Sequence, residues 1–154
     1  MDTTSVVVGV DGGPDSLRAL EWAADYARTV NAPLIALTAY DLPTLYGPYA
    51  MAGWEGSTEL KARARDMLAG AVRDALGEDA VVEQRVVRGH PAQAIIAASE
   101  DARLVVVGSR GRGGFAGMLL GSVSQHVVPN AHCPVVVLPH KPAVERPHRG
   151  PETA

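Results

Sequence analysis

The sequence predicts an α/β protein: an open, five-stranded parallel sheet with strand order 3-2-1-4-5 and helices on both faces. Five short apolar runs alternate with stretches of helical periodicity along the chain, which is the pattern of repeated strand–helix units. The runs are mostly apolar rather than alternating, as strands buried on both faces are. Glycine-bearing turns follow the first and fourth runs. Placing these two strands side by side brings both turns to one crevice at the carboxyl ends of the strands.

The first strand is predicted over residues 5–10 (SVVVGV), and the turn cluster DGGPDS at residues 11–16 ends it. Apolar residues then recur at helical spacing over residues 17–27, so we expect the first helix there. The Asn-Ala-Pro sequence at residues 31–33 stops that helix. The apolar run at residues 34–39 predicts the second strand.

A long loop is expected over residues 41–56, because no apolar period is visible there. Leu, Met, Val and Ala side chains at helical spacing then predict a second helix from residue 60 to residue 75. Gly77 follows and closes this helix. The third strand is predicted over residues 81–87, where apolar and polar residues partly alternate.

The last third of the chain continues the same alternation. Pro91 stands where the first turn of a helix tolerates proline, and Ala and Ile residues extend that helix. The fourth strand is predicted over residues 104–107, and a fourth helix from Gly121 to about Val128. Residues 135–138 predict the fifth strand.

Composition limits the classes of function. The chain has 154 residues, of which 47% are hydrophobic and 20% charged, and its net charge is −3. These values are typical of one globular domain, and no basic face indicates nucleic-acid binding. No apolar stretch approaches the roughly 20 residues that span a bilayer, and the first residues do not resemble a signal peptide. The single cysteine, Cys133, fits a reducing environment, so we expect a cytoplasmic protein that contacts neither nucleic acid nor membrane.

We expect the domain to cover residues 1–139 and residues 140–154 to form a disordered tail. Four of the sixteen residues from Pro139 onward are proline, and no apolar period survives there.

The segment VVVGSRGRGGFAGMLLGSVS, residues 105–124, carries the functional signal. Glycines after a strand allow backbone N–H groups to approach an anionic group, and a helix that begins near Ser122 would point its positive end at that group. Phosphate is the natural ligand. No lysine follows a glycine, which argues against a P-loop. A dinucleotide fingerprint forced from Gly111, Gly113 and Ala116 lacks the acidic residue about 20 positions further on.

The spacing Gly108-x2-Gly111-x9-Gly121-Ser122 resembles the ATP-binding branch of the universal stress protein family. Three further stretches resemble that family: VGVD at residues 8–11, RG before PA at residues 88–92, and CPVVV at residues 133–137. The resemblance covers residues 4–139. It implies a single domain of the Rossmann-like, HUP-type fold.

The resemblance also implies a nucleotide site that holds ATP, with Mg²⁺ bound to the phosphates. The residues implied as nucleotide-binding are Gly9, Val10, Asp11, Ala39, Val107, Gly108, Ser109, Arg110, Gly111, Arg112, Gly121, Ser122, Val123 and Ser124. Asp11 would lie near the ribose or hold the Mg²⁺, since this hard cation prefers carboxylate oxygen. Ala39 would line the adenine, and Arg110 and Arg112 would meet phosphate oxygens.

The fifth strand is expected at an edge of the sheet, where an unpaired apolar strand invites pairing with another chain. The resembled family forms homodimers by antiparallel pairing of its last strand. The resemblance therefore implies a homodimer through Val135, Val136 and Val137, with Pro134 and Pro139 limiting the paired length.

The activity expected from these features is that of a nucleotide-dependent switch in a stress response, with slow or no ATP hydrolysis. No base stands out near the distal phosphate end, although His126 lies one helical turn beyond Ser122. ATP would order the segments 111–121 and 41–56 and so alter a contact with a protein partner that the sequence does not name.

Other interpretations stay open at this point. Asp11 and Asp15 are also typical of turns and helix N-caps, and the aromatic residues Tyr46, Tyr49 and Trp54 would cover either the nucleotide or apolar surface. The DGGPDS turn is similar to the SGGxDS loop of adenylylating ATP pyrophosphatases, with aspartate in place of serine. A cAMP-binding protein and an interaction protein without nucleotide are further alternatives. His126, His132 and Cys133 lack a zinc-site spacing.

Overall fold

The computed structural model describes residues 5–41, 53–111 and 120–141, and the side chains of residues 53–57 are outside this description. Tyr46, Tyr49, Arg112 and the side chain of Trp54, which sequence analysis singled out, therefore lie outside the described part of the chain. The same holds for most of the two segments that were expected to respond to ATP.

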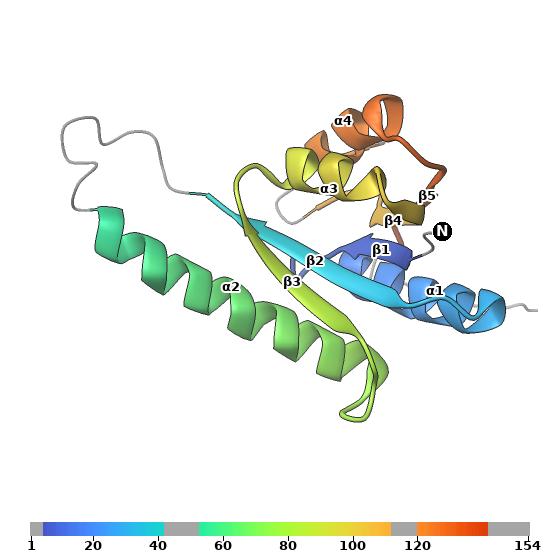
Figure 1. Cartoon of the computed structure of the whole chain (residues 1–154), viewed down its shortest axis with the longest axis horizontal. Coiled ribbons are helices and arrows are strands. Elements are labelled where there is room, and N and C mark those ends of the chain that lie inside the picture. The colour runs from blue at the N-terminus through green and yellow to red at the C-terminus, as the bar shows by residue number, and fades with distance from the viewer. Residues whose placement is uncertain (1–4, 42–52, 112–119, 142–154) are drawn as a thin grey trace, which may run out of the picture.

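Five parallel strands form one sheet in the order β3-β2-β1-β4-β5, which confirms the predicted fold class (Figure 1). The strands are β1 (Ser5–Gly9), β2 (Leu34–Tyr40), β3 (Glu83–Arg88), β4 (Ala102–Gly108) and β5 (Val135–Leu138). β3 begins two residues later than predicted, because Val81 is 95% exposed and pairs with no strand. β1 and β4 are neighbours at the centre, as the two glycine-bearing turns required.

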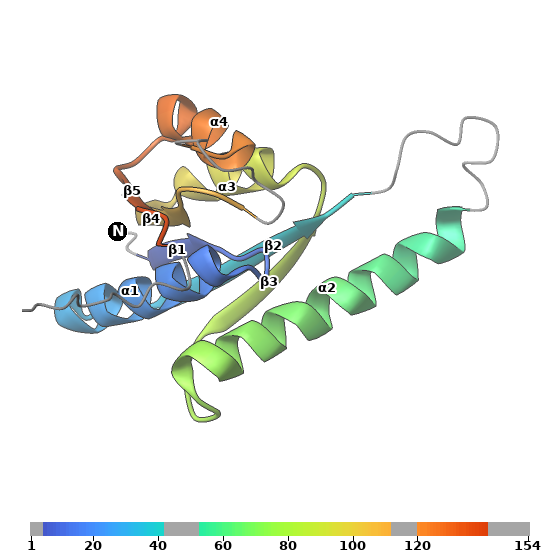
Figure 2. The ribbon, with the colours of Figure 1, turned by 180° about the vertical axis from the view of Figure 1, so that it is seen from behind.

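Helices cover both faces of the sheet. The helices are α1 (Pro14–Val30), α2 (Gly53–Leu76), α3 (Pro91–Ser99) and α4 (Ser122–Asn130). α1 and α2 lie on one face, and α3 and α4 on the other (Figures 1 and 2). α2 begins at Gly53, so the expected loop over residues 41–56 is shorter than predicted. The first turns of α2 project beyond the sheet in Figure 1, so they need no apolar stripe.

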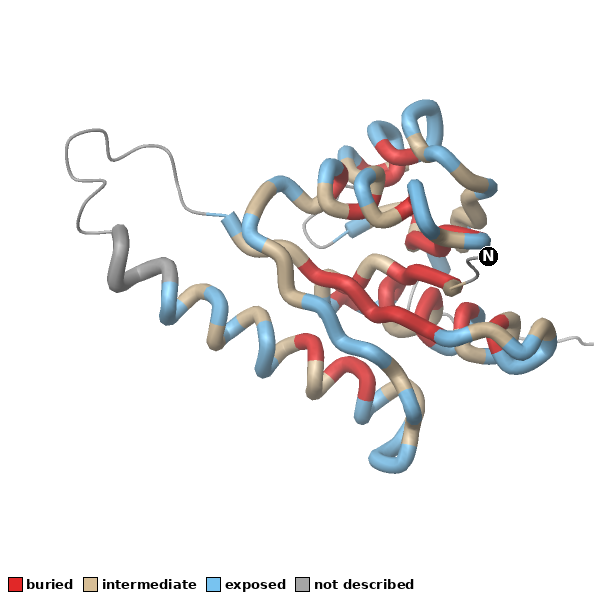
Figure 3. The backbone as a smooth tube through the Cα atoms, viewed as in Figure 1, coloured by how far each residue is buried: buried red, intermediate tan, exposed pale blue. Residues whose placement is uncertain are grey.

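The hydrophobic core has two halves, one on each face of the sheet. Alternate residues of each central strand point to opposite faces, so Val6 and Val8 pack with α1 and α2 while Val7 packs with α3 and α4. Val105 and Val106 divide between the faces in the same way. Figure 3 shows the buried residues concentrated along the central strands. This two-sided burial explains why the strands are continuous apolar runs.

Two glycines at strand ends allow helices to pack directly on the backbone. A Cβ atom at Gly108 would lie 2.8 Å from the Asp15 Cβ and 3.2 Å from the Asp15 backbone carbon, at the start of α1. A Cβ atom at Gly9 would lie 2.8 Å from the Ile95 Cδ1, in α3. The first contact is with backbone and with the fixed base of a side chain, whereas the second is with the movable end of a side chain.

The Gly108→Ala variant should therefore be clearly less stable than the Gly9→Ala variant. We expect Gly108→Ala to lower the free energy of unfolding by about 1–3 kcal/mol, because neither contacting atom can move without shifting α1. Gly9→Ala should cost less than about 1 kcal/mol, because the Ile95 side chain can rotate. Urea denaturation of both variants measures the difference, and equal losses would contradict the packing described here.

Cys133 precedes β5 and is partly buried. Burial raises the pKa of the Cys133 thiol, and a backbone hydrogen bond with Val105 opposes part of that rise. The thiol should therefore be a weaker nucleophile than a free thiol at neutral pH, because only the thiolate reacts. The pH dependence of alkylation by iodoacetamide tests this. The midpoint should lie above that of the cysteine in a short peptide blocked at both ends in the same buffer, and a midpoint at or below that reference would contradict it.

Candidate functional site

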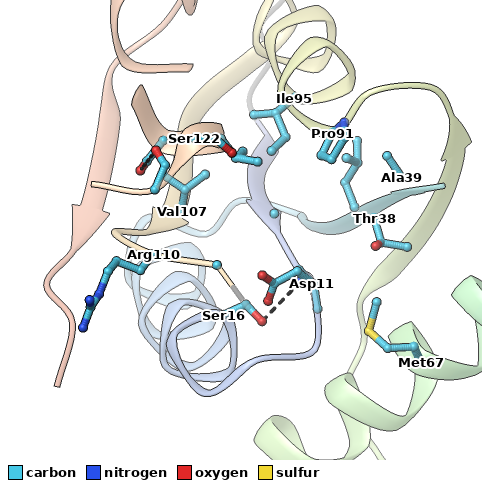
Figure 4. Close-up of a pocket in the computed structure, with 18 of the residues that line it drawn as sticks. Asp11, Ser16, Thr38, Ala39, Met67, Pro91, Ile95, Val107, Arg110 and Ser122 are labelled. Carbon is cyan, nitrogen blue, oxygen red and sulfur yellow. Dashed lines mark hydrogen bonds between the residues drawn. The ribbon is translucent and has the colours of Figure 1, made fainter. Parts of the chain in front are cut away.

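A cavity of about 680 Å³ opens at the carboxyl ends of the central strands (Figure 4). Its walls come from the ends of β1, β2 and β4, the turn before α1, and parts of α2, α3 and α4. In parallel α/β sheets the crevice outside the carboxyl ends of the strands is where ligands bind. The position of the cavity thus agrees with the crevice that the two glycine-bearing turns predicted.

The turn after β1 is built around Asp11. The Gly13 N–H donates to Asp11 Oδ1 over 2.8 Å, the Asp11 N–H donates to Ser16 Oγ over 3.3 Å, and Ser16 Oγ donates to the Gly13 carbonyl over 3.0 Å. This is the local geometry in which an aspartate stabilises a turn two residues ahead. Asp11 also lines the cavity. It is therefore both a turn residue and part of the cavity wall.

Asp15 has neither of the roles that sequence analysis considered for it. The N-cap of α1 is Gly13, and Asp15 is the second residue of the helix. Its side chain does not cap the helix but accepts hydrogen bonds from Arg18 and His140. The interpretation of Asp15 as a turn or cap residue is wrong, because glycine takes the cap position and the Asp15 side chain is buried instead.

Residues 109–111 and 121–124 are folded tightly against each other. The Gly121 N–H donates to the Ser109 carbonyl over 2.6 Å, and Ser124 Oγ donates to the same carbonyl over 2.9 Å. A Cβ atom at Gly121 would lie 3.2 Å from the Arg110 Cα and 3.2 Å from the Gly111 nitrogen. The glycine at position 121 is thus required by packing between the two segments, whatever else they bind.

The carboxylate of Asp11 faces the first of these segments, residues 109–111. A Cβ atom at Gly111 would lie 2.8 Å from Asp11 Oδ2. Position 111 must therefore lack a side chain for the two turns to approach each other. The glycines recognised in the sequence are therefore needed for close contacts within the chain, in addition to any contact with a ligand.

The start of α4 gives the cavity its positive end. Its N-cap is Gly121, and no side chain among the described residues caps the helix. Ser122, Val123 and Ser124, the first three residues of α4, all line the cavity. Uncapped amides at a helix N-terminus, together with the helix dipole, favour an anion. The hydroxyl of Ser124 is engaged with the backbone, so its backbone amide rather than its hydroxyl hydrogen is available to a ligand.

All of the predicted site residues that the structure describes line this cavity except Ser109; Arg112 lies outside the described residues. Ser109 is buried behind the wall, and its Oγ has no hydrogen-bond partner in the part of the chain that the structure describes. Arg110 lines the cavity, but its guanidinium extends away from Asp11 in Figure 4.

Sequence analysis missed most of the cavity wall that β2, α2 and α3 form. Thr38 of β2, Met67 of α2 and Pro91 and Ile95 of α3 line the cavity and are labelled in Figure 4. Thr38 is 5% exposed and is a polar residue in an otherwise apolar strand, which was an available signal. Met67 reaches the cavity only because of the way α2 packs over β2. No local sequence pattern predicts this packing.

Two features are absent from the described residues. No cluster of three or more His, Cys, Asp or Glu side chains has the arrangement of a metal site within those residues. Among the described helices, none combines the length and the apolar character that crossing a membrane requires.

The comparison with known sequences agrees with these features. The model of the universal stress protein family matches residues 3–139. A universal stress protein of Mycobacterium tuberculosis is 42% identical over 148 residues, which cover 90% of this chain and 45% of the relative. One from Methanocaldococcus jannaschii is 33% identical, covering 86% of this chain and 80% of the relative. The chain thus spans about half the length of its mycobacterial relatives.

Solved structures have the same fold. The universal stress protein UspA from Lactobacillus plantarum superposes with a TM-score of 0.75 at 22% identity, covering 90% of this chain and 99% of that protein. A universal stress protein in complex with cAMP gives a TM-score of 0.56 at 33% identity, covering 90% of this chain and 98% of that protein. With the family model matched across nearly all of the described chain, this protein belongs to the universal stress protein family.

Proposed function

We propose that the cavity binds ATP, with Mg²⁺ on the phosphates, and that the protein is a nucleotide-dependent regulator with slow or no hydrolysis. The observation that carries this proposal is the uncapped start of α4, held by the Gly121–Ser109 hydrogen bond at the edge of a cavity of about 680 Å³. A volume of this size is within the range of small-molecule sites.

The two ends of the cavity differ in chemistry, as a nucleotide requires. Leu37, Ala39, Met67 and Ile95 supply apolar surface at one end, suited to a purine ring. Thr38 adds a hydroxyl group that could form a hydrogen bond with the base and so contribute to base specificity. At the other end, the backbone of residues 122–124 and of Gly111 would supply amides for phosphate, whereas the Gly121 amide is engaged by the Ser109 carbonyl. The sugar would then lie between them, over the end of β1.

Mg²⁺ would complete the charge balance. Asp11 is the only carboxylate among the described residues that line the cavity, and Arg63 and Arg110 are the only cations. Oδ1 of Asp11 accepts from Gly13, whereas Oδ2 is directed toward Gly111, on the phosphate side. Asp11 would hold the divalent ion, whose charge would offset the repulsion between the Asp11 carboxylate and the phosphates.

A cyclic nucleotide is the second candidate. The solved relative at 33% identity is a complex with cAMP. With a single phosphate, cAMP would use fewer of the amides at the start of α4 and would have less need of Mg²⁺. The two ligands are therefore separated by the Mg²⁺ dependence of binding.

The proposal of slow or absent hydrolysis rests on the described part of the cavity wall, which offers no evident base for an attacking water. The only carboxylate that lines the described cavity wall is already used by the turn before α1, and no described histidine lines the cavity. Phosphoryl transfer needs a group that orients the attacking water. ATP turnover of several per second that is lost in Asp11→Ala would contradict this part of the proposal.

The direct test is to titrate the purified protein with ATP and with cAMP, with and without Mg²⁺. ATP should bind more tightly than cAMP, and Mg²⁺ should strengthen ATP binding. Gly111→Ala should weaken ATP binding by about tenfold or more, about 1.4 kcal/mol, because the new Cβ collides with Asp11 Oδ2. Asp11→Asn should abolish most of the effect of Mg²⁺.

Gly70→Ala is the matched control. Gly70 lies in α2, outside the cavity lining, and a Cβ atom there would meet only the movable end of Arg73 at 3.7 Å. This variant should bind ATP like the wild type. If the protein binds cAMP more tightly than ATP and without Mg²⁺, cAMP replaces ATP as the proposed ligand. If the protein binds neither ligand, the proposal of a nucleotide site fails, and the alternative of an interaction protein without nucleotide is favoured.

We also propose that the protein is a homodimer in which β5 strands pair across a twofold axis. β5 is an edge strand of the sheet, and Val135, Val136 and Val137 are all only partly buried. Such an edge is a ready template for a second chain.

Sedimentation at micromolar concentration should give twice the mass of one chain. Deuterium exchange of the β5 amides should slow as the protein concentration rises, because dimerisation would supply their hydrogen-bond partners. A monomer mass across the concentration range would refute the dimer.

A further inference from the structure

Asp15 is a buried carboxylate that does not line the cavity. It is 4% exposed, yet two basic side chains reach it. His140 Nδ1 lies 3.1 Å from Oδ1 and 3.0 Å from Oδ2, and Arg18 Nη1 lies 3.1 Å from Oδ1. We refer to Asp15, Arg18 and His140 as the Asp15 cluster. A buried carboxylate is stable only when its oxygens are paired in this way.

The Asp15 cluster holds the residues that follow β5 against α1. His140 lies just beyond the end of that strand, and Arg18 Nη2 donates to the carbonyl of Pro139. One residue earlier, the Leu138 carbonyl accepts from the Ser109 N–H over 2.9 Å. Three successive residues, 138–140, are therefore attached to α1 or to the turn after β4.

Asp15 also packs against a residue of the cavity wall. The backbone and Cβ of Asp15 are the atoms against which Gly108 packs, and Gly108 lines the cavity. The next residue, Ser109, uses its carbonyl to hold Gly121 and Ser124 at the start of α4. A displacement of Asp15 would therefore displace Gly108 and Ser109, and with them the amides of α4 that face the cavity.

We propose that Asp15 and His140 are positioning residues of the nucleotide site: they fix the start of α1 and the end of β5 against Gly108 and Ser109, and so hold the phosphate-facing amides of α4 in place. This inference rests on the proposed function for its effect on affinity. It gives a role to His140, which sequence analysis assigned to a disordered tail.

The chemistry of the contact defines a sharp set of variants. An ionised carboxylate only accepts hydrogen bonds, so His140 Nδ1 must carry a hydrogen. The side-chain amide of asparagine can place an N–H donor near the position of that nitrogen, whereas alanine cannot. His140→Asn should therefore keep the contact and His140→Ala should lose it. Arg28→Gln is the matched control, since it breaks an exposed ion pair with Asp25 on the same helix.

The experiment measures the dissociation constant for Mg-ATP and the amide hydrogen exchange of the ligand-free protein. His140→Ala should weaken binding about threefold to tenfold, which lies within the range found for mutations that modulate coupling between distant sites. Exchange at residues 108–111 should speed up in this variant. His140→Asn should stay within about twofold of the wild type, and Arg28→Gln should change neither quantity.

Two results would overturn the proposal: His140→Ala that binds like the wild type, or His140→Asn that binds as weakly as His140→Ala. If the wild type binds no nucleotide, the proposed function fails. In that case hydrogen exchange alone decides whether the Asp15 cluster holds the turn, and unchanged exchange in His140→Ala would refute the cluster as a positioning device.

Discussion

The approach of β4 to α1 at Gly108 is the contact on which the arrangement of the site depends. A strand end can pack on the backbone of a helix only where the strand carries no side chain, and here the atom that a side chain would meet is 2.8 Å away. Because β4 and β1 are adjacent, this contact sets the distance between the turn after β1 and the turn after β4. The cavity lies between these two turns and the neighbouring helices.

The remaining glycines of the motif extend the same constraint. Gly111 allows Asp11 to face the turn after β4, and Gly121 allows the start of α4 to lie against Arg110. Ser124 and Gly121 then share the carbonyl of Ser109. The result is an uncapped helix end whose position is fixed by backbone contacts rather than by cationic side chains. Such a site can hold phosphate without a P-loop lysine.

The fold and one wall of the site were predictable from local signals. Continuous apolar strands indicated a parallel sheet, and the glycine spacing located the turn after β4, although the close internal contacts that require these glycines were not foreseen. The wall formed by Met67 and Ile95 was missed, because it arises where α2 and α3 pack over strand ends distant in sequence. His140 was assigned to the tail for a related reason: its partner Asp15 lies 125 residues earlier, and no composition or period reveals such a pair.

The proposed function requires that the amides at the start of α4 bind the phosphates of a nucleotide. Titrating ¹⁵N-labelled protein with ATP and, separately, with adenosine tests this most directly by NMR. We predict that the amide signals of Ser122, Val123 and Ser124 shift strongly with ATP and little with adenosine, while residues near Ala39 and Met67 shift with both. Equal shifts of the α4 amides with both ligands, or no shifts at these residues with ATP, would contradict the account.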